Sequence, residues 1–212
     1  GVMLRHPALL AKMAITLDHI SGGRALCGLG AGWFRQEAEM YGMPWPSTGE
    51  RLARLEEAAH VCRSLFNEQR TTYHGQHYHL TDAAAAPKPI QSRLPLLIGG
   101  GGKRRTIRIA ARHADIWNTF GSPAAMKLKL ALLRRYCAEV GGEASAITAT
   151  VAVMLDGDES MERIAARLAD YQRAGMGGVV IDLPAPYDLA LLEHAAQARS
   201  QLATGTNVRQ HW

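Results

Sequence analysis

The sequence has no long hydrophobic run, few cysteines and few aromatic residues. No stretch approaches the ~20 consecutive apolar residues that a helix needs to cross a bilayer, and residues 1–5 lack the layout of a signal peptide. The 3 cysteines are an odd number, lie far apart and form no CxxC pair, so a disulfide framework is not expected. They fit a protein of the reducing cytoplasm.

The chain also lacks the long basic stripe with interleaved aromatics that nucleic-acid binding favours. Its net charge is +5, and the densest basic group is confined to residues 103–105, with Arg108 and Arg112 following. A mild positive balance suits an anionic small ligand equally well. We therefore expect a small-molecule substrate and no nucleic-acid or membrane partner; a homodimer is compatible with this expectation.

What the chain does contain is an ordinary globular composition with a regular order of elements. Its 212 residues are 47% hydrophobic and 20% charged, which is enough for a sizeable core. Helices are predicted at 7–20, 49–67, 103–113, 122–140, 159–174 and 187–203, and strands at 24–30, 94–98, 115–120, 147–155 and 177–183. A hairpin over 72–80 turns at Gly75. Five β-then-α units predict an α/β fold with a parallel sheet.

Three local features are predicted within these elements. The first helix carries apolar residues at helical spacing, namely Leu9, Leu10, Met13, Leu17 and Ile20. Asp158 is the expected N-cap of the helix at 159–174. Asp18 and Arg24, which flank the end of the first helix, are expected to form a structural pair.

The length indicates part of a larger barrel. A complete eight-fold βα barrel typically needs about 250 residues. The chain starts in what reads as the end of a strand and has no initiator Met. We therefore expect the C-terminal two-thirds of such a barrel. Residues 1–203 would form one domain, incomplete at its N-terminus, and 204–212 a flexible tail.

Two glycine-rich segments follow predicted strands: Gly28-Leu29-Gly30-Ala31-Gly32-Trp33 and Gly99-Gly100-Gly101-Gly102-Lys103. Ligands bind at the carboxyl ends of strands in parallel βα folds. Without a Cβ, backbone N–H groups can approach a phosphate, and the following helix adds its positive end. The second segment opens into a basic helix and is the better predicted anion site. Tight turns are the alternative explanation, and neither segment matches a dinucleotide fingerprint or a P-loop.

Candidate catalytic and metal-binding residues are few. Strand alternation would put His77 and His79 of the hairpin on one face, with His74 nearby, but we favour solvated polar residues over a metal site. No side chain stands out as acid, base or nucleophile, so no catalytic residue is assigned and no metal is expected. A fold that binds a phosphorylated ligand without such side chains points to a cofactor that carries the chemistry itself.

A series of motifs extends from about residue 3 to residue 183. They are Arg5-His6-Pro7, Leu17 to Arg24, Gly28 to Trp33, Glu37 with Gly42, Arg51 to Glu57, Tyr73-His74-Gly75, Leu96 to Gly100 and Ala114 to Asn118. In this order and spacing the chain resembles the bacterial luciferase-like monooxygenase family, most of all its coenzyme F-420-dependent oxidoreductases. The resemblance implies a (β/α)8 TIM barrel, present here from the end of strand 3 to helix 8.

The resemblance also implies a flavin or deazaflavin at the carboxyl ends of the strands. The residues that would bind its phosphate or lie beside it are Gly99, Gly100, Gly101 and Gly102, and Gly30, Ala31 and Gly32. In the luciferase branch an arginine for the FMN phosphate stands at the position of Ala31, so its absence favours coenzyme F-420, with FMN as the alternative. The implied reaction is hydride transfer with a small organic substrate, or oxygen activation with reduced FMN.

Two further hypotheses stay open at this point. A truncated, non-catalytic remnant would be excluded by an upstream reading frame of roughly 80 residues with three βα units, the size that completes a barrel. A nicotinamide-binding Rossmann domain rests on the incomplete first glycine segment, and a barrel-type strand order would exclude it. Residues 68–95 are expected to form part of a lid over the pocket.

Overall fold

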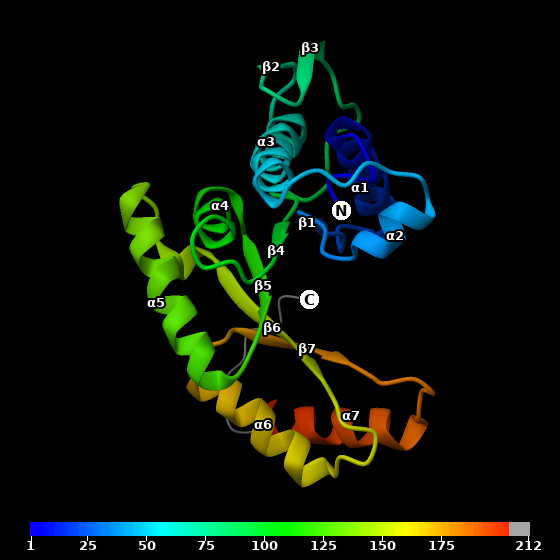
Figure 1. Cartoon of the computed structure of the whole chain (residues 1–212), viewed down its shortest axis with the longest axis vertical. Helices are drawn as coiled ribbons and strands as arrows, with labels where there is room; N and C mark the ends of the chain where they lie inside the picture. The colour runs from blue at the N-terminus through cyan, green and yellow to red at the C-terminus, as the bar shows by residue number, and fades with distance from the viewer. Residues whose placement is uncertain (204–212) are drawn as a thin grey trace.

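The computed structural model describes residues 1–203 and contains a five-stranded parallel sheet (Figure 1). Its strands are β1 (Cys27–Gly30), β4 (Leu96–Gly99), β5 (Ile116–Phe120), β6 (Thr148–Met154) and β7 (Gly178–Asp182), in the order β1-β4-β5-β6-β7. Each strand is added on the same side of the previous one, whereas a doubly wound sheet reverses direction at a switch point. The expected parallel α/β fold is confirmed, and the Rossmann hypothesis is excluded.

The five predicted β-then-α units are all present. The helices are α1 (Pro7–Ser21), α2 (Arg35–Met40), α3 (Thr48–Asn67), α4 (Thr106–His113), α5 (Pro123–Glu139), α6 (Met161–Arg173) and α7 (Leu189–Ala203), with a short 3-10 turn at Ala144–Ala146. The hairpin consists of β2 (Thr71–His74) and β3 (His79–Ala83). Helix α2 was not predicted, and the predicted tail lies outside the described residues. Within residues 1–203, no helix is both long and apolar enough to cross a membrane.

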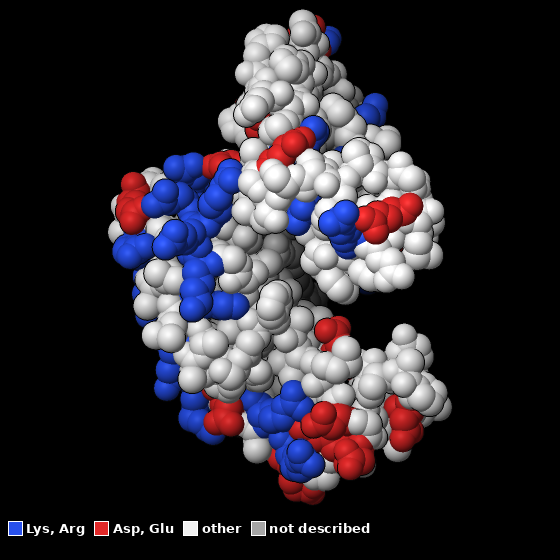
Figure 2. Space-filling model, in the orientation of Figure 1, with Lys and Arg blue, Asp and Glu red and all other residues white. Residues whose placement is uncertain are grey.

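The sheet has one covered face and one open face. Ile98, Trp117 and Val151 are fully buried beneath the helices. Their strand neighbours Leu97 and Asn118 point to the opposite face and are half-exposed, as strand alternation requires. Helices α4 to α6 lie along the covered side of the sheet (Figure 1), and the molecular surface is hollowed on the other side (Figure 2). A ligand could therefore reach the carboxyl ends of the strands from the open face.

Helix α1 packs through small residues and Ile15 rather than through the apolar residues identified in the sequence. Its buried residues include Ala11 and Ala14, whereas Leu17 and Ile20 are 56% and 76% exposed. Small side chains allow α1 to approach α3 closely, which leaves the apolar stripe identified in the sequence at the surface, apart from the partly buried Leu10.

The expected pair between Asp18 and Arg24 is wrong. The Asp18 carboxylate is fully buried and accepts hydrogen bonds from the backbone N–H of Ile90 at 2.8 Å, and from the backbone N–H and side-chain Nε2 of Gln91 at 3.1 and 2.6 Å. Arg24 instead donates from Nε to the carbonyl of Ser21 at 2.9 Å. The reason is the left-handed turn after α1, which returns Arg24 to the end of the helix and leaves Asp18 to hold the loop before β4.

The N-cap of α6 also differs from the prediction. Ser160, not Asp158, caps the helix, because its Oγ accepts the N–H of Arg163 at 3.4 Å. Glu159 is buried and pairs with Arg167 at 2.5 Å. Because Glu159 is buried in this pair, the helix begins after Ser160, two residues later than it would with Asp158 as the N-cap.

Asp115 joins three segments at the amino end of the sheet. Its carboxylate accepts hydrogen bonds from the backbone N–H of Leu96 at 2.8 Å, from Arg63 at 2.5 Å and from Arg93 at 2.6 Å. Burial opposes ionisation of this carboxyl, but these donors and the Arg63 charge outweigh it, so its pKa is lowered. Asp115 therefore ties α3 and the loop before β4 to the start of β5.

Replacing Asp115 with Asn should lower the free energy of unfolding by about 1–3 kcal/mol at pH 7, because two guanidinium groups lose their anionic partner. The folded pKa lies below the unfolded value of about 3.9, so the stabilisation is complete above that pH and is lost as the pH falls through the folded pKa. Urea unfolding of both proteins between pH 3 and 7 measures this difference.

The matched control is Asp170→Asn, which removes an exposed pair with Arg173. It should change stability by no more than about 0.5 kcal/mol. A difference between parent and Asp115→Asn that stays constant down to pH 3 would contradict the role assigned to this carboxylate.

Candidate functional site

The two glycine segments predicted to form a site lie side by side. Strand β1 pairs in parallel with β4, and the register places Gly30 opposite Gly99. A Cβ on Gly99 would stand only 3.6 Å from the carbonyl oxygen of Leu29. Because parallel strands end at the same edge of a sheet, residues 30–32 and 99–102 meet at one rim. The structure thus brings all the predicted cofactor-binding residues together.

The first segment is fixed by contacts within the protein. The carbonyl of Gly30 accepts the N–H of Val2 at 3.0 Å, and Ala31 is half-buried against the core. Gly32 has φ +81°, and a Cβ there would come within 3.2 Å of the Trp45 ring. Trp45 in turn lies under the guanidinium of Arg51 at 4.2 Å. No positive side chain stands at position 31 itself.

In the second segment, some backbone N–H groups donate hydrogen bonds within the protein and others do not. Gly100, at φ +133°, donates its N–H to the carbonyl of Asn118 at 2.9 Å and accepts from the Trp117 indole at 3.0 Å. Within the described part of the chain, the N–H groups of Gly101 and Gly102 have no hydrogen-bond partner. The predicted anion site therefore narrows from residues 99–102 to these two donors.

The basic helix begins later than predicted. Residues 103–105 form a turn, and α4 starts at Thr106. The turn is held by Ile107, whose N–H reaches the carbonyl of Gly102 at 3.2 Å, and by Arg105, which donates to the carbonyl of Gly49 at 3.1 Å. Thr106 packs back over the glycines, since its Oγ1 would lie 2.7 Å from a Cβ on Gly102. The glycines are therefore needed partly to admit the protein's own side chains.

Sequence reasoning missed a lysine at this rim. Lys129 extends from α5, and its Nζ donates to Thr119 Oγ1 at 2.9 Å and to the carbonyl of Phe120 at 2.7 Å. A Cβ on Gly101 would stand 2.8 Å from the same Nζ. Burial, with a smaller effect from Lys103, lowers the pKa of Lys129. The sequence could have indicated this lysine by its position on the apolar face of the helix. The apolar residues that α5 buries on that face are Met126, Leu130, Leu133, Tyr136 and Cys137.

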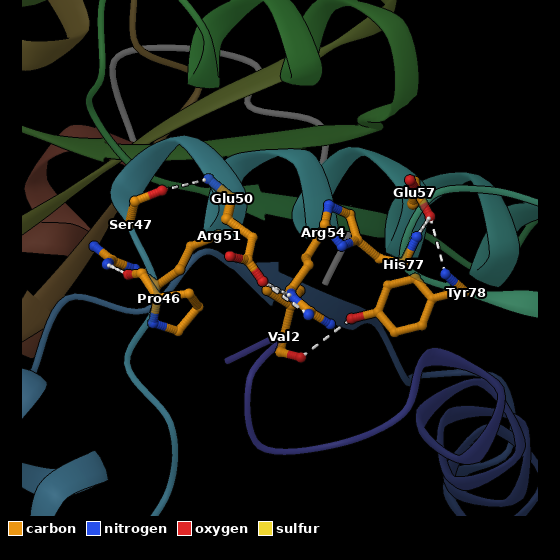
Figure 3. Close-up of polar contacts among 9 residues, drawn as sticks. All are labelled: Val2, Pro46, Ser47, Glu50, Arg51, Arg54, Glu57, His77 and Tyr78. Atoms are coloured by element: carbon orange, nitrogen blue, oxygen red, sulfur yellow. Dashed lines mark hydrogen bonds and ion pairs between the residues drawn. The ribbon is translucent and has the colours of Figure 1, made fainter.

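The hairpin is anchored on α3 by one carboxylate (Figure 3). Glu57 accepts the backbone N–H groups of His77 at 2.9 Å and of Tyr78 at 3.1 Å. It also accepts the backbone N–H of Gln76 at 2.9 Å. The Tyr78 hydroxyl donates to the carbonyl of Val2 at 3.3 Å. These contacts fix the hairpin turn against α3 and the N-terminal segment beside β1. A lid role for residues 68–95 stays a prediction.

The hairpin histidines do not form the pair expected from strand alternation. His74 and His79 face each other across β2 and β3, with ring centroids 6.3 Å apart. His77 lies in the turn between the strands, so the prediction that His77 and His79 share a strand face is wrong. The turn is longer than the sequence indicated because Glu57 holds its N–H groups. Among residues 1–203, no group of three His, Cys, Asp or Glu side chains could hold a metal ion.

Comparisons with known proteins identify the family. The family model for luciferase-like monooxygenases matches residues 2–211. The chain is 34% identical over 116 residues to an FMNH(2)-dependent dimethylsulfone monooxygenase of Pseudomonas putida, covering 55% of this chain. It is 36% identical over 110 residues to an F420-dependent glucose-6-phosphate dehydrogenase of Kineococcus radiotolerans, covering 52% of this chain. In each case the matched part spans 32% of the relative's own length.

A solved structure shows the same fold. An F420-dependent secondary alcohol dehydrogenase in complex with an F420-acetone adduct superimposes with a TM-score of 0.81 at 19% identity. The match covers 93% of this chain and 74% of that one. The expected TIM-barrel type of fold is therefore confirmed.

Replacing Gly100 with Ala should destabilise the protein by about 1–3 kcal/mol, because φ +133° is strained for a residue with a Cβ, which would also meet Thr106. Gly28→Ala is the control, since only Leu97 lies within 4 Å of a Cβ there, at 3.9 Å. It should change stability by no more than about 0.5 kcal/mol. Urea unfolding compares the two, and equal effects would contradict this reading of the loop.

Proposed function

The chain belongs to the luciferase-like monooxygenase family, and we propose that it forms the cofactor-binding part of an oxidoreductase that transfers a hydride between a small organic substrate and coenzyme F-420. An FMN-dependent monooxygenase that uses O2 is the second candidate. We also propose a cytoplasmic location, which three buried, unpaired cysteines support. The proposal includes no nucleic-acid or membrane partner, and it is compatible with a homodimer.

The observation that carries the proposal is the meeting of two glycine segments at one rim of the sheet. Gly101 and Gly102 offer unused N–H donors there, and the loop 99–105 contains no acidic residue that would repel an anion. Such a rim fits the phosphate of a flavin or deazaflavin cofactor. The bound cofactor would supply the redox chemistry, while the protein binds it, orients it and excludes competing reactions.

The choice of coenzyme F-420 rests on position 31. The family includes relatives named for FMNH(2) and for F420, so membership alone does not choose between them. In the luciferase branch an arginine for the FMN phosphate would stand at this position. Here Ala31 is half-buried against the core and brings no charge to the rim. The smaller positive charge beside the first glycine segment supports the deazaflavin.

The substrate would be met on the open face of the sheet. Phe120 and Met154, at the carboxyl ends of β5 and β6, are 64% and 57% exposed, and Asn118 lies behind Phe120 on the same face. Two large apolar side chains with one amide favour a small organic molecule with limited polarity. Its identity depends on loops that vary among βα barrels.

Equilibrium titrations with coenzyme F-420 and FMN, followed by cofactor fluorescence and absorbance, test the cofactor. We expect saturable binding of both with F-420 the tighter, because position 31 lacks the arginine. Tighter binding of FMN would support the monooxygenase candidate instead. Binding of neither compound would contradict the proposed function.

Replacing Ala31 with Arg should raise the affinity for FMN by roughly tenfold, because a charge-assisted hydrogen bond to phosphate is worth about 1.5–3 kcal/mol and part of this offsets the lost packing. Ala166→Arg adds the same charge at an exposed position of α6 and should leave binding unchanged. The same titrations measure both variants, and an equal response would refute the importance of position 31.

A further inference from the structure

Lys129 is a buried cation whose partners are all neutral. The residue is 7% exposed, and its Nζ contacts the hydroxyl of Thr119 and the carbonyl of Phe120. The Phe120 ring lies 5.0 Å from the same nitrogen. Two acceptors satisfy two of the three N–H bonds of an ammonium group. One donor remains at the rim of the sheet.

This cation has no counter-ion in the part of the chain that the structure describes. None of the ion pairs within residues 1–203 involves Lys129, and the charge that contributes to lowering its pKa, after burial, is that of another cation, Lys103. Elsewhere Glu159 is paired with Arg167 at 2.5 Å, and the fully buried Asp18 carboxylate accepts three hydrogen bonds from neutral donors. An ammonium kept from water without an opposite charge is costly. The position therefore favours an anion from outside the chain.

The unused donor lies where the glycine loop approaches. The Nζ occupies space that a Cβ on Gly101 would enter, at 2.8 Å, and Thr119 Oγ1 stands 3.1 Å from the same point. Gly101 and Gly102 also have unused N–H groups within residues 1–203. Helices α4 and α5, which flank this loop, carry a dense group of Lys and Arg side chains on their outer surface (Figure 2). Two kinds of donor, the Lys129 ammonium and the two backbone N–H groups, thus meet at one short loop.

We propose that Lys129 binds the phosphate of the flavin or deazaflavin cofactor and, together with the N–H groups of Gly101 and Gly102, makes its anion site. This inference rests on the proposed function and adds to it the side chain that supplies the charge. Lys103, which is exposed in the adjoining turn, strengthens the local field without being buried. The glycine at position 101 is then required because it admits the lysine as well as the ligand.

A purely structural role makes a different prediction. Lys129 could serve only to satisfy the carbonyl at the end of β5, where it bonds Phe120. In that case its removal would weaken binding of every ligand at the rim equally, whether or not the ligand carries a phosphate. A charge role affects only the phosphorylated forms.

The test compares Lys129→Met with Lys127→Met, an exposed lysine two residues earlier on the same helix. Each protein is titrated with FMN and riboflavin, and with coenzyme F-420 and its phosphate-free deazaflavin. We expect Lys129→Met to weaken the phosphorylated cofactor about 10- to 100-fold, the range for a hydrogen bond to a charged group. The phosphate-free forms should change less than about threefold, and Lys127→Met should match the parent within the same limit.

The outcomes separate the two proposals. If the parent binds neither cofactor, the proposed function fails, and the assignment of Lys129 fails with it. If the parent binds and Lys129→Met keeps its full preference for the phosphorylated form, only the role of Lys129 is overturned. An equal loss for both forms also overturns it, in favour of the structural role.

A second variant guards against misfolding. Lys129→Gln keeps an N–H donor for the Phe120 carbonyl while removing the charge, and thermal melting checks that each variant folds. It should show the same selective loss for phosphorylated ligands. If neither variant folds, Lys129 is a structural residue of the β5–α5 connection and the proposal is refuted.

Discussion

The pairing of β1 with β4 is the constraint on which the site depends. The two strands are separated by more than sixty residues of chain that include α3 and the hairpin, so local structure alone cannot align them. Contacts with the segment that leads into β4 set the register: Asp18 holds residues 90 and 91, Cys27 donates its N–H to the carbonyl of Pro95 at 2.9 Å, and Asp115 holds Leu96. A shift of one residue would move Gly30 out of register with Gly99.

The glycines at this rim are required by the packing of the protein itself, independently of any ligand. Gly32 makes room for Trp45, and Gly100 and Gly102 make room for Thr106. These contacts keep the loop in one conformation, which reduces the entropy cost of ordering it when a ligand binds. Losing a glycine would therefore reduce stability and binding together. Substituting a side chain that reaches the rim from a neighbouring element therefore tests binding more selectively than substituting a glycine.

The sequence predicted the elements and the strand ends, because apolar periodicity and glycine punctuation are local signals. The same signals located residues 30–32 and 99–102. They could not show that Arg105 would bond Gly49 and delay α4 to Thr106, or that Glu57 would hold His77 in a turn. Lys129 was visible only as a charge on an apolar helix face. Its role at the site depends on its contacts with Gly101 and Thr119, which are separate in the sequence and become neighbours only in the fold.

Alternation along β5 divides the site between the two faces of the sheet. Thr119 points to the helix-covered side and meets Lys129, whereas Asn118 and Phe120 point to the open side. On the proposed function, charge recognition comes from behind the sheet and substrate contact from its front. The two sets of residues belong to one strand and meet at Phe120, whose ring lies 5.0 Å from Lys129 Nζ. A change at Met154 on β6 could therefore alter the substrate while the anion site stays intact, whereas a change at Phe120 would affect both.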